Sequence, residues 1–290
     1  MRSTVTNPFA VRRFALVAAV ALALPSLPVF ASESISSAQT EEIRTYADLA
    51  DLADHAPIVV RGEVQKASRL KPAQAGNVRA GYARVYIEAK TRALLVGSGI
   101  GESIRYLADV KLSPEGKLPK LRKAQVIVFA NPVPGRPGEL RLVAPDAQLA
   151  ATPEMESRVR ALLAELVAAD AAPRVTGVRE AMHVAGNLAG EGETQLFLST
   201  ERGDPVSISV MHRPGMAPQW GVSLSEIVDQ AAQAPARNTL LWYRLACSLP
   251  ADLPRDAILS GSAADRQRAV ADYRLVISGL GPCDRTRTNT

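Results

Sequence analysis

The chain has 290 residues, and its 34 Lys and Arg against 29 Asp and Glu give a formal net charge of +5. Residues 1–31 hold three Arg and no acidic residue, so the remaining 259 residues carry 31 basic and 29 acidic side chains, a net charge of +2. Near neutrality excludes binding to polyanions through bulk charge. An apolar content of 47% and a charged content of 22% exclude global disorder and indicate one large or two small globular domains.

Residues 1–31 have the three-part pattern of a secretory signal peptide. Positive charge up to Arg13 precedes the apolar run Phe14–Leu24, and small residues precede a cleavage site between Ala31 and Ser32. The alternative is a membrane anchor, but crossing the hydrocarbon takes about 20 apolar residues. No cysteine stands near the cleavage site to carry a lipoprotein anchor. We therefore expect a periplasmic or secreted protein with no membrane span once the signal peptide is removed.

The two cysteines, Cys247 and Cys283, predict one disulfide, because an even pair in an oxidising compartment is normally bonded. Closing this loop removes roughly 3–4 kcal/mol of unfolded-state entropy in the chain-entropy model. The alternatives are a metal pair or a redox couple. Neither is indicated, since there is no CxxC motif and the three histidines are scattered at His55, His183 and His212.

The first half predicts a small β-rich domain at residues 42–150. A flexible N-terminus at 32–41 precedes a helix over Glu41–His55, whose apolar residues recur at helical spacing. Five strands are then expected, separated by Gly-rich and Pro-rich turns, at Ile58–Val64, Tyr82–Leu95, Ser103–Val110, Gln125–Ala130 and Leu140–Val143. Five consecutive strands must protect their edges, and a five-stranded barrel of the OB type does so economically.

The second half predicts a mixed domain, so that the fold class is α+β. A linking helix at 151–173 is capped by Thr152, and an α+β domain at 174–290 with the disulfide follows it. Thr194–Thr200 and Val206–Met211 read as a hairpin. Capping residues at Ser223, Asn238 and Ser262 indicate three helices, and the last of them should bury Val270, Tyr273, Ile277 and Leu280.

One set of residues could form an enzyme site. Glu191 and Glu193 stand in a Gly-rich loop, where paired carboxylates could carry acid–base chemistry or bind Ca²⁺. His183 and His212 would meet if their strands were neighbours. The plainer interpretation is a solvated loop and two surface or half-buried histidines. No G-x-S-x-G elbow and no metal-ligand spacing occurs, so the sequence predicts no catalytic residue, no cofactor and no metal site.

Three further motifs have plainer explanations. Gly97–Gly101 lacks the Lys of a phosphate-binding loop and precedes a strand rather than a helix, so it is expected to be a turn. Arg202-Gly203-Asp204 is an adhesion tripeptide elsewhere, but here it falls in the expected hairpin turn. Trp220 could anchor a partner at the surface, although packing onto the helix after Ser223 is the simpler expectation.

A run of basic residues could contact an anionic partner, either an envelope protein or an envelope polymer. Only Glu115 opposes its five cations, which are Lys111, Lys117, Lys120, Arg122 and Lys123. The alternative is an ordinary solvated loop. Nucleic acid is not expected, because single-strand binders of the barrel type stack bases on aromatic residues. Residues 58–145 offer only Tyr82, Tyr86, Tyr106 and Phe129.

Residues 47–64 (ADLADLADHAPIVVRGEV) resemble the opening of an uncharacterised family of exported bacterial proteins, in which an Ala-Asp helix precedes a V-x-G-x-V strand. The layout through Val143 is similar to the OB-type barrel of netrin-like and metalloprotease-inhibitor domains. Those inhibitors coordinate zinc through a Cys at the mature N-terminus. Here that end is expected at Ser32 and the barrel region has no Cys, so the resemblance implies the fold without the zinc mechanism.

These patterns together predict a non-enzymatic binding or interaction protein of the cell envelope. Its main support is that no catalytic set of residues outweighs a structural explanation. The alternative is a hydrolase or metal-dependent enzyme that uses His183, Glu191, Glu193 and His212. The enzyme hypothesis requires these four side chains to converge in a concave pocket. The binding hypothesis requires a contiguous apolar or basic patch.

Overall fold

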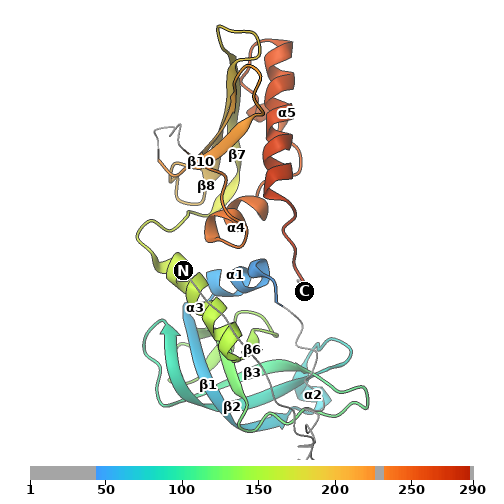
Figure 1. Ribbon diagram of the computed structural model, residues 1–290. Helices are drawn as coiled ribbons and strands as arrows, with labels where there is room; N and C mark the ends of the chain where they lie inside the picture. Colours follow the sequence, from blue (N-terminus) through green and yellow to red (C-terminus); the bar gives the residue numbers. More distant parts are fainter. Residues whose placement is uncertain (1–43, 226–231, 288–290) are drawn as a thin grey trace, which may run out of the picture. The chain divides into compact units, whose positions relative to one another are not determined.

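Two antiparallel β-sheets and the helices packed on them make up an α+β fold, as the sequence predicts (Figure 1). The computed structural model describes residues 44–225 and 232–287, all within the unit Glu42–Thr290. The expected signal peptide at 1–31, the flexible N-terminus at 32–41 and the helix expected after Ser223 lie outside the described residues. No helix in the described ranges is long and apolar enough to cross a membrane.

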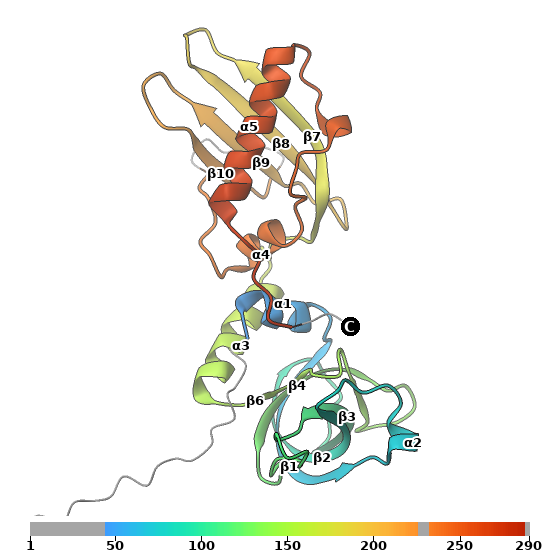
Figure 2. The ribbon, with the colours of Figure 1, turned by 90° about the vertical axis from the view of Figure 1, so that its right-hand side faces the viewer.

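The N-terminal sheet contains six strands and curls tightly on itself (Figure 2). Its strands are β1 (Ile58–Arg69), β2 (Tyr82–Val96), β3 (Ser103–Lys111), β4 (Gln125–Pro132), β5 (Leu140–Leu142) and β6 (Gln148–Ala150). The order is β3-β2-β1-β4-β5, with β6 also paired to β4. An isolated parallel bridge joins Arg105 of β3 to Glu139 just before β5, but no ladder closes the sheet.

Alternation along β2 builds the core inside this curl. Val85, Ile87 and Ala89 are buried, as the expected strand pattern requires, whereas their neighbours in sequence are half-buried or, at Lys90, exposed. Opposite them, Ile104 and Tyr106 of β3 are buried in the same apolar cluster. The Tyr106 hydroxyl donates to the Gln148 side chain at 2.7 Å, which links β3 to β6 across the core.

Short capping motifs set the helix limits. Helix α1 (Tyr46–Asp54) begins after Thr45 rather than at Glu41, because Thr45 and Asp48 form a reciprocal capping box. Helix α3 (Pro153–Val167) begins at Thr152, as expected, but ends before residue 173. The four-residue α2 (Pro72–Ala75) was not expected. One core cluster of buried residues extends from β1 and β4 through α1 and α3 to the C-terminal sheet.

The C-terminal sheet has the order β10-β9-β8-β7, and helix α5 (Ala263–Leu280) lies along one face of it (Figure 2). Its strands are β7 (Val175–Ala185), β8 (Gly192–Thr200), β9 (Ser207–His212) and β10 (Gln219–Ser223). The expected hairpin is β8–β9. Beyond β7, the segment after the 3-10 helix η1 (Arg255–Ala257) forms a further edge, where the Leu259 amide donates to Ala181 O at 2.9 Å.

Of the three capping and helix expectations for this half, one is wrong, one is right in part, and one falls outside the described residues. Ser223 ends β10, where it pairs with Ser207, and the helix expected after it lies outside the described residues. Helix α4 (Leu240–Ala246) is capped by Thr239, because Asn238 has a φ of 59° and lies in the left-handed region. The buried face of α5 includes Tyr273 and Leu280, as expected, whereas Val270 and Ile277 are half-buried and Asp272 is buried where an apolar stripe does not predict it. Its buried residues are Ala269, Asp272, Tyr273, Val276 and Leu280.

Candidate functional site

The structure brings His183 and His212 together on the face of the C-terminal sheet that α5 covers. His183 of β7 pairs with Thr194 of β8, and His212 of β9 pairs with Gly192 on the other side of β8. The two imidazole rings lie edge to face, with centroids 6.3 Å apart. The two histidines therefore come together, but not on neighbouring strands as the sequence hypothesis supposed, because β8 lies between β7 and β9.

Asp272 of α5 joins the two histidines into one buried hydrogen-bond network. His212 Nε2 lies 2.9 Å from Asp272 Oδ1, and the Thr194 hydroxyl donates to Asp272 Oδ2. His183 Nδ1 lies 2.9 Å from that same hydroxyl oxygen. Because the hydroxyl proton already points at the carboxylate, His183 Nδ1–H must be the donor to Thr194. The network fixes which ring nitrogens of the two histidines carry hydrogen.

Burial explains the electrostatics and the composition of this network. Desolvation lowers the pKa of His183, although Asp272 and Asp265 act in the opposite direction. Gly192 leaves room for the ring, since a Cβ there would lie 2.8 Å from His183 Cε1. Thr194 has no exposed surface and Asp272 is 2% exposed. The network therefore links α5 to the sheet through buried hydrogen bonds.

Glu191 and Glu193 do not join this network. Glu193 points to the opposite face of β8, because side chains alternate along the strand, and it accepts from the Gln195 side chain at 3.1 Å. Glu191 stays in the turn and accepts from the Leu188 amide at 3.2 Å. The four-residue set expected of an enzyme is therefore not assembled. Within residues 44–225 and 232–287, no group of three or more His, Cys, Asp and Glu could hold a metal ion.

The basic run forms an exposed patch at one end of the N-terminal sheet. We call it the basic lobe and define it as Lys111, Lys117, Lys120, Arg122 and Lys123, all exposed. The Leu112 amide donates to Gly81 O at 2.8 Å, and the Lys123 amide donates to Val64 O at 2.7 Å. These bonds hold both ends of the loop against the β1–β2 hairpin. None of the five side chains makes an ion pair with any described residue.

The neighbouring hairpin adds cations to the same end of the sheet. Arg69 and Lys71 are exposed and have no acidic partner among the described residues. Lys66 pairs with Glu88 at 3.5 Å, and Arg84 makes a bidentate pair with Asp109 at 2.7 and 2.9 Å. Nearby carboxylates are thus already engaged by other cations. No ion pair with a described residue neutralises the five cations of the lobe.

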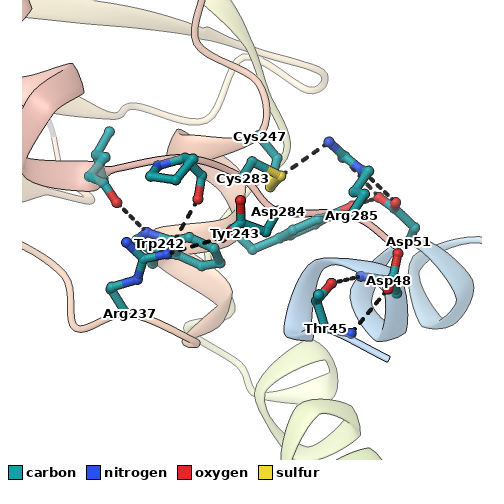
Figure 3. The surroundings of a disulfide bond; sticks show 12 residues. Thr45, Asp48, Asp51, Arg237, Trp242, Tyr243, Cys247, Cys283, Asp284 and Arg285 are labelled. Carbon is teal, nitrogen blue, oxygen red and sulfur yellow. Dashed lines mark hydrogen bonds and ion pairs between the residues drawn. A yellow bond between two sulfur atoms is a disulfide. The ribbon is translucent and has the colours of Figure 1, made fainter. Parts of the chain in front are cut away.

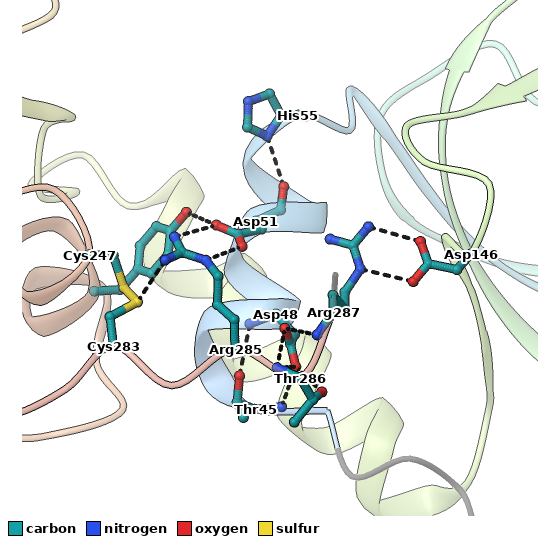
Figure 4. Close-up of polar contacts among 11 residues, drawn as sticks. Thr45, Asp48, Asp51, His55, Asp146, Cys247, Cys283, Arg285, Thr286 and Arg287 are labelled. Atoms are coloured by element: carbon teal, nitrogen blue, oxygen red, sulfur yellow. Dashed lines mark hydrogen bonds and ion pairs between the residues drawn. A yellow bond between two sulfur atoms is a disulfide. The ribbon is translucent and has the colours of Figure 1, made fainter. Parts of the chain in front are cut away.

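A second polar cluster was not expected from the sequence, because it joins α1 to the last described residues of the chain (Figure 4). Asp48 is fully buried and accepts from the amides of Thr286 and Arg287 at 3.1 and 3.0 Å and from the Thr286 hydroxyl. Arg285 makes a bidentate pair with Asp51 at 2.7 and 3.1 Å. Arg287 makes another with Asp146 at 3.1 and 2.9 Å, in the turn before β6.

The pKa values in this cluster follow from its hydrogen bonds. Burial disfavours the charge of Asp48, but hydrogen bonds from the Thr286 side chain and the Arg287 amide outweigh it, so the pKa of Asp48 is lowered. The pKa of Asp146 is lowered in the same way, since the nearby Arg287 guanidinium outweighs burial. Both carboxylates are therefore held in their charged form. We call residues 285–287 the C-terminal strap.

The two cysteines lie beside the start of the C-terminal strap (Figure 3). Cys247 follows α4 and Cys283 follows α5, and their sulfurs are 2.08 Å apart across a sequence separation of 36. Trp242 of α4 also ties α4 to α5, since its indole N–H donates to Leu280 O at 2.8 Å. The Arg285 guanidinium donates to Cys283 Sγ at 3.1 Å as well as to Asp51. The Cys pair thus sets the position from which the strap extends to α1.

A buried ion pair joins α4 to α1 beside the strap. Arg244 is 6% exposed and binds both oxygens of Asp54 at 2.6 and 2.8 Å. Arg174 approaches the same carboxylate at 2.9 Å. Burial opposes ionisation of Asp54, but Arg244 and Arg174 outweigh it and lower its pKa. Helix α1 thus presents three carboxylates, and each of them accepts hydrogen bonds from the C-terminal half: Asp48, Asp51 and Asp54.

The remaining sequence candidates occupy structural positions. Gly97 has a φ of 107° at a turn, where a Cβ would lie 2.6 Å from Pro57 O. Arg202-Gly203-Asp204 forms the turn between β8 and β9, as expected. Trp220 is half-buried, and the helix expected to cover it lies outside the described residues. Trp220 lies on β10 facing α5, where a Cβ on Gly279 would come within 2.9 Å of its indole nitrogen.

Asp48 and Asp272 are the site residues that sequence reasoning missed. The Thr45-x-x-Asp48 spacing was a capping-box signal, but nothing in it points to a strap 238 residues away. Asp272 lies among charged residues on α5 and carries no distinguishing pattern. Comparison of the chain with protein-family models finds no match, and comparison with curated proteins finds none either. Function is therefore inferred from these residues and their contacts.

Proposed function

We propose that this protein is a non-enzymatic binding protein of the cell envelope that holds a linear anionic polymer on the basic lobe. The observation that carries the proposal is a set of five exposed cations with no ion-pair partner among the described residues. Unpaired cations gathered at one end of a sheet create a local positive potential even in a chain of near-neutral net charge. The expected signal peptide and the Cys247–Cys283 pair support export of the protein to the envelope.

The fold proposed for the lobe's scaffold is an OB-type barrel. The strand order β3-β2-β1-β4-β5 supports it, because the parallel bridge from Arg105 to Glu139 brings the two ends of that order together. Two backbone bonds reinforce the seam, from the Arg105 amide to Gly138 O and from the Asp109 amide to Pro145 O, both 2.8 Å. In this proposal the lobe is a loop of the barrel that bears charge on a rigid support.

The alternative enzyme function is not favoured by any observation in the C-terminal sheet. Glu193 and His183 lie on opposite faces of the sheet. The hydrogen-bonding groups of the histidine network face one another between the sheet and α5. General acid–base chemistry requires the catalytic group to reach the substrate's proton. The histidine network therefore supports a structural role, and binding through the lobe is the better proposal.

The test is salt-dependent binding of labelled polyphosphate and of poly-L-glutamate, followed by fluorescence anisotropy. A variant with Lys117→Glu, Lys120→Glu and Arg122→Glu is expected to bind at least tenfold more weakly. It makes fewer contacts with the polymer, so that binding releases fewer counterions. These side chains are exposed, so the variant should fold. The wild-type affinity should fall as salt is raised, and the variant should show a shallower dependence.

The matched control reverses the same number of charges at exposed arginines away from the lobe. Arg141→Glu, Arg213→Glu and Arg268→Glu change the net charge equally and remove no ion pair. Equal losses in both triple variants would show attraction by net charge alone and would contradict the proposal. No binding of either polymer by the wild type would also contradict it. Loss in the lobe variant alone would support it.

A further inference from the structure

A groove on α5, separate from the basic lobe, combines cationic and apolar side chains. It has a volume of about 550 Å³ and runs between α5 and the segment that contains η1. Figure 2 shows α5 and this segment side by side. The groove is lined by Arg255 and Ile258 on one wall, and on the other by Ala263, Arg266, Gln267, Val270, Ala271 and Arg274. The α5 residues recur three and four apart, so they form one stripe of the helix.

The three arginines of the groove carry charge that the described residues leave largely uncompensated. Arg255 has no partner among the described residues. Arg274 lies 3.7 Å from Asp252, but these side chains are 67% and 82% exposed, which makes a weak pair. Arg266 donates to the backbone carbonyls of Ser260 and Gly261, which fix its head without neutralising it. No carboxylate lines the groove.

The carboxylates nearest in sequence do not change this balance. Asp252 is the weak partner of Arg274 and is turned to solvent. Asp265 accepts from the Ser262 hydroxyl at 2.6 Å and so completes the cap of α5. Asp256 stands in η1 and is exposed. An anion entering the groove would therefore meet guanidinium groups at the walls without displacing an established internal pair.

Both walls are held in place by the rest of the C-terminal sheet. Leu259 donates its amide to Ala181 O, and the Ser260 hydroxyl accepts from the His183 amide at 2.9 Å, so the segment beside η1 is fixed to β7. On α5, Asp272 and Tyr273 are buried against the sheet, which turns Val270 and Arg274 toward the groove. A preformed groove binds with less ordering cost than a flexible one.

We propose that this groove binds a small amphiphilic anion, with an acidic head between the arginines and a short apolar body against Ile258, Val270 and the two alanines. The volume suits a body of one or two rings or a short alkyl chain. A sulfonate or carboxylate head accepts the planar, forked donors of arginine in bidentate geometry. A neutral or cationic amphiphile of the same size lacks this interaction.

The test uses 8-anilinonaphthalene-1-sulfonate, whose fluorescence rises in an apolar site, with the full-length folded protein. Octanoate is expected to displace the dye, whereas octyl glucoside and octyltrimethylammonium are not. A variant with Arg255→Gln and Arg274→Gln should bind the dye at least tenfold more weakly. The control variant, with Arg213→Gln and Arg268→Gln, loses the same charge and should match the wild type. Thermal melting checks that both variants remain folded.

Three outcomes would overturn the proposal. The first is equal dye affinity in the groove variant and the control variant. The second is displacement by the cationic or neutral amphiphile as effectively as by octanoate. The third is loss of binding to phosphatidylglycerol vesicles in the groove variant with no change toward octanoate, which would identify a membrane surface as the ligand. The basic-lobe variant should keep full dye affinity, so failure of the polymer proposal leaves this test unaffected.

Discussion

Replacing Asp48 by Asn is expected to release the C-terminal strap and destabilise the protein. The side chain is fully buried, and its two oxygens accept from Thr45, Thr286 and Arg287. An amide has one acceptor oxygen and presents N–H groups in place of the other, so one or two buried donors lose their acceptor. Each unsatisfied donor costs about 1–3 kcal/mol, and the expected loss is therefore about 3 kcal/mol in the free energy of unfolding.

Urea denaturation at neutral pH measures this loss, and limited trypsin digestion after Arg285 and Arg287 measures exposure of the strap. The matched control is Asp170→Asn, since Asp170 is exposed and has no partner among the described residues. The lowered pKa of Asp48 means that its stabilisation is complete above the usual value of 3.8 and is lost as the pH falls through the folded-state pKa. The difference between wild type and variant should therefore shrink in acid. A variant with unchanged urea midpoint and trypsin sensitivity would refute the strap's role.

Three further outcomes are expected. The double variant Cys247→Ser, Cys283→Ser should lose about 4 kcal/mol in the free energy of unfolding, from the chain-entropy model for a sequence separation of 36. Urea denaturation measures this loss, and a value below about 1 kcal/mol would contradict a closed disulfide. Arg244→Ala should cost about 3 kcal/mol, because the buried Asp54 carboxylate keeps only Arg174, and an unchanged melting temperature would refute this. Burial lowers the pKa of His183, so the free energy of unfolding should fall as the pH drops below 6.5, the usual pKa of histidine. The melting temperature of a His183→Gln variant should depend less on pH over this range, and an equal dependence in both proteins would contradict the reasoning.

Much of the first half could be predicted from the sequence because its strands are long and alternate. Tyr82–Val96 shows its buried face through Val85, Ile87 and Ala89 with no need of tertiary information. By contrast, β7 contains Gly177, Arg179 and Glu180 along with a register shift, so it shows no regular period. The five residues of β10 are too few for a pattern. Such strands form because neighbouring strands supply the hydrogen bonds and α5 covers the face.

The candidate sites divide in the same way. Charge runs such as the basic lobe are visible in the sequence. The approach of His183 to His212 could be suggested from the sequence, but not its geometry, because the two strands flank β8 instead of pairing with each other. The carboxylate that joins those histidines comes from α5, 60 residues beyond His212, and has no local signature. The strap depends on contacts separated by 238 residues. Contacts of this range are decided by the packed fold and leave no periodic trace.

The strap also makes the folding of α1 depend on residues that are synthesised much later. Thr286 follows Asp48 by 238 residues, yet it and Arg287 supply donors that the Asp48 carboxylate accepts. Until residues 285–287 have been made, this carboxylate lacks these partners, and a product that terminates before residue 285 never acquires them. Such shortened products are therefore expected to be preferred targets of quality-control proteases.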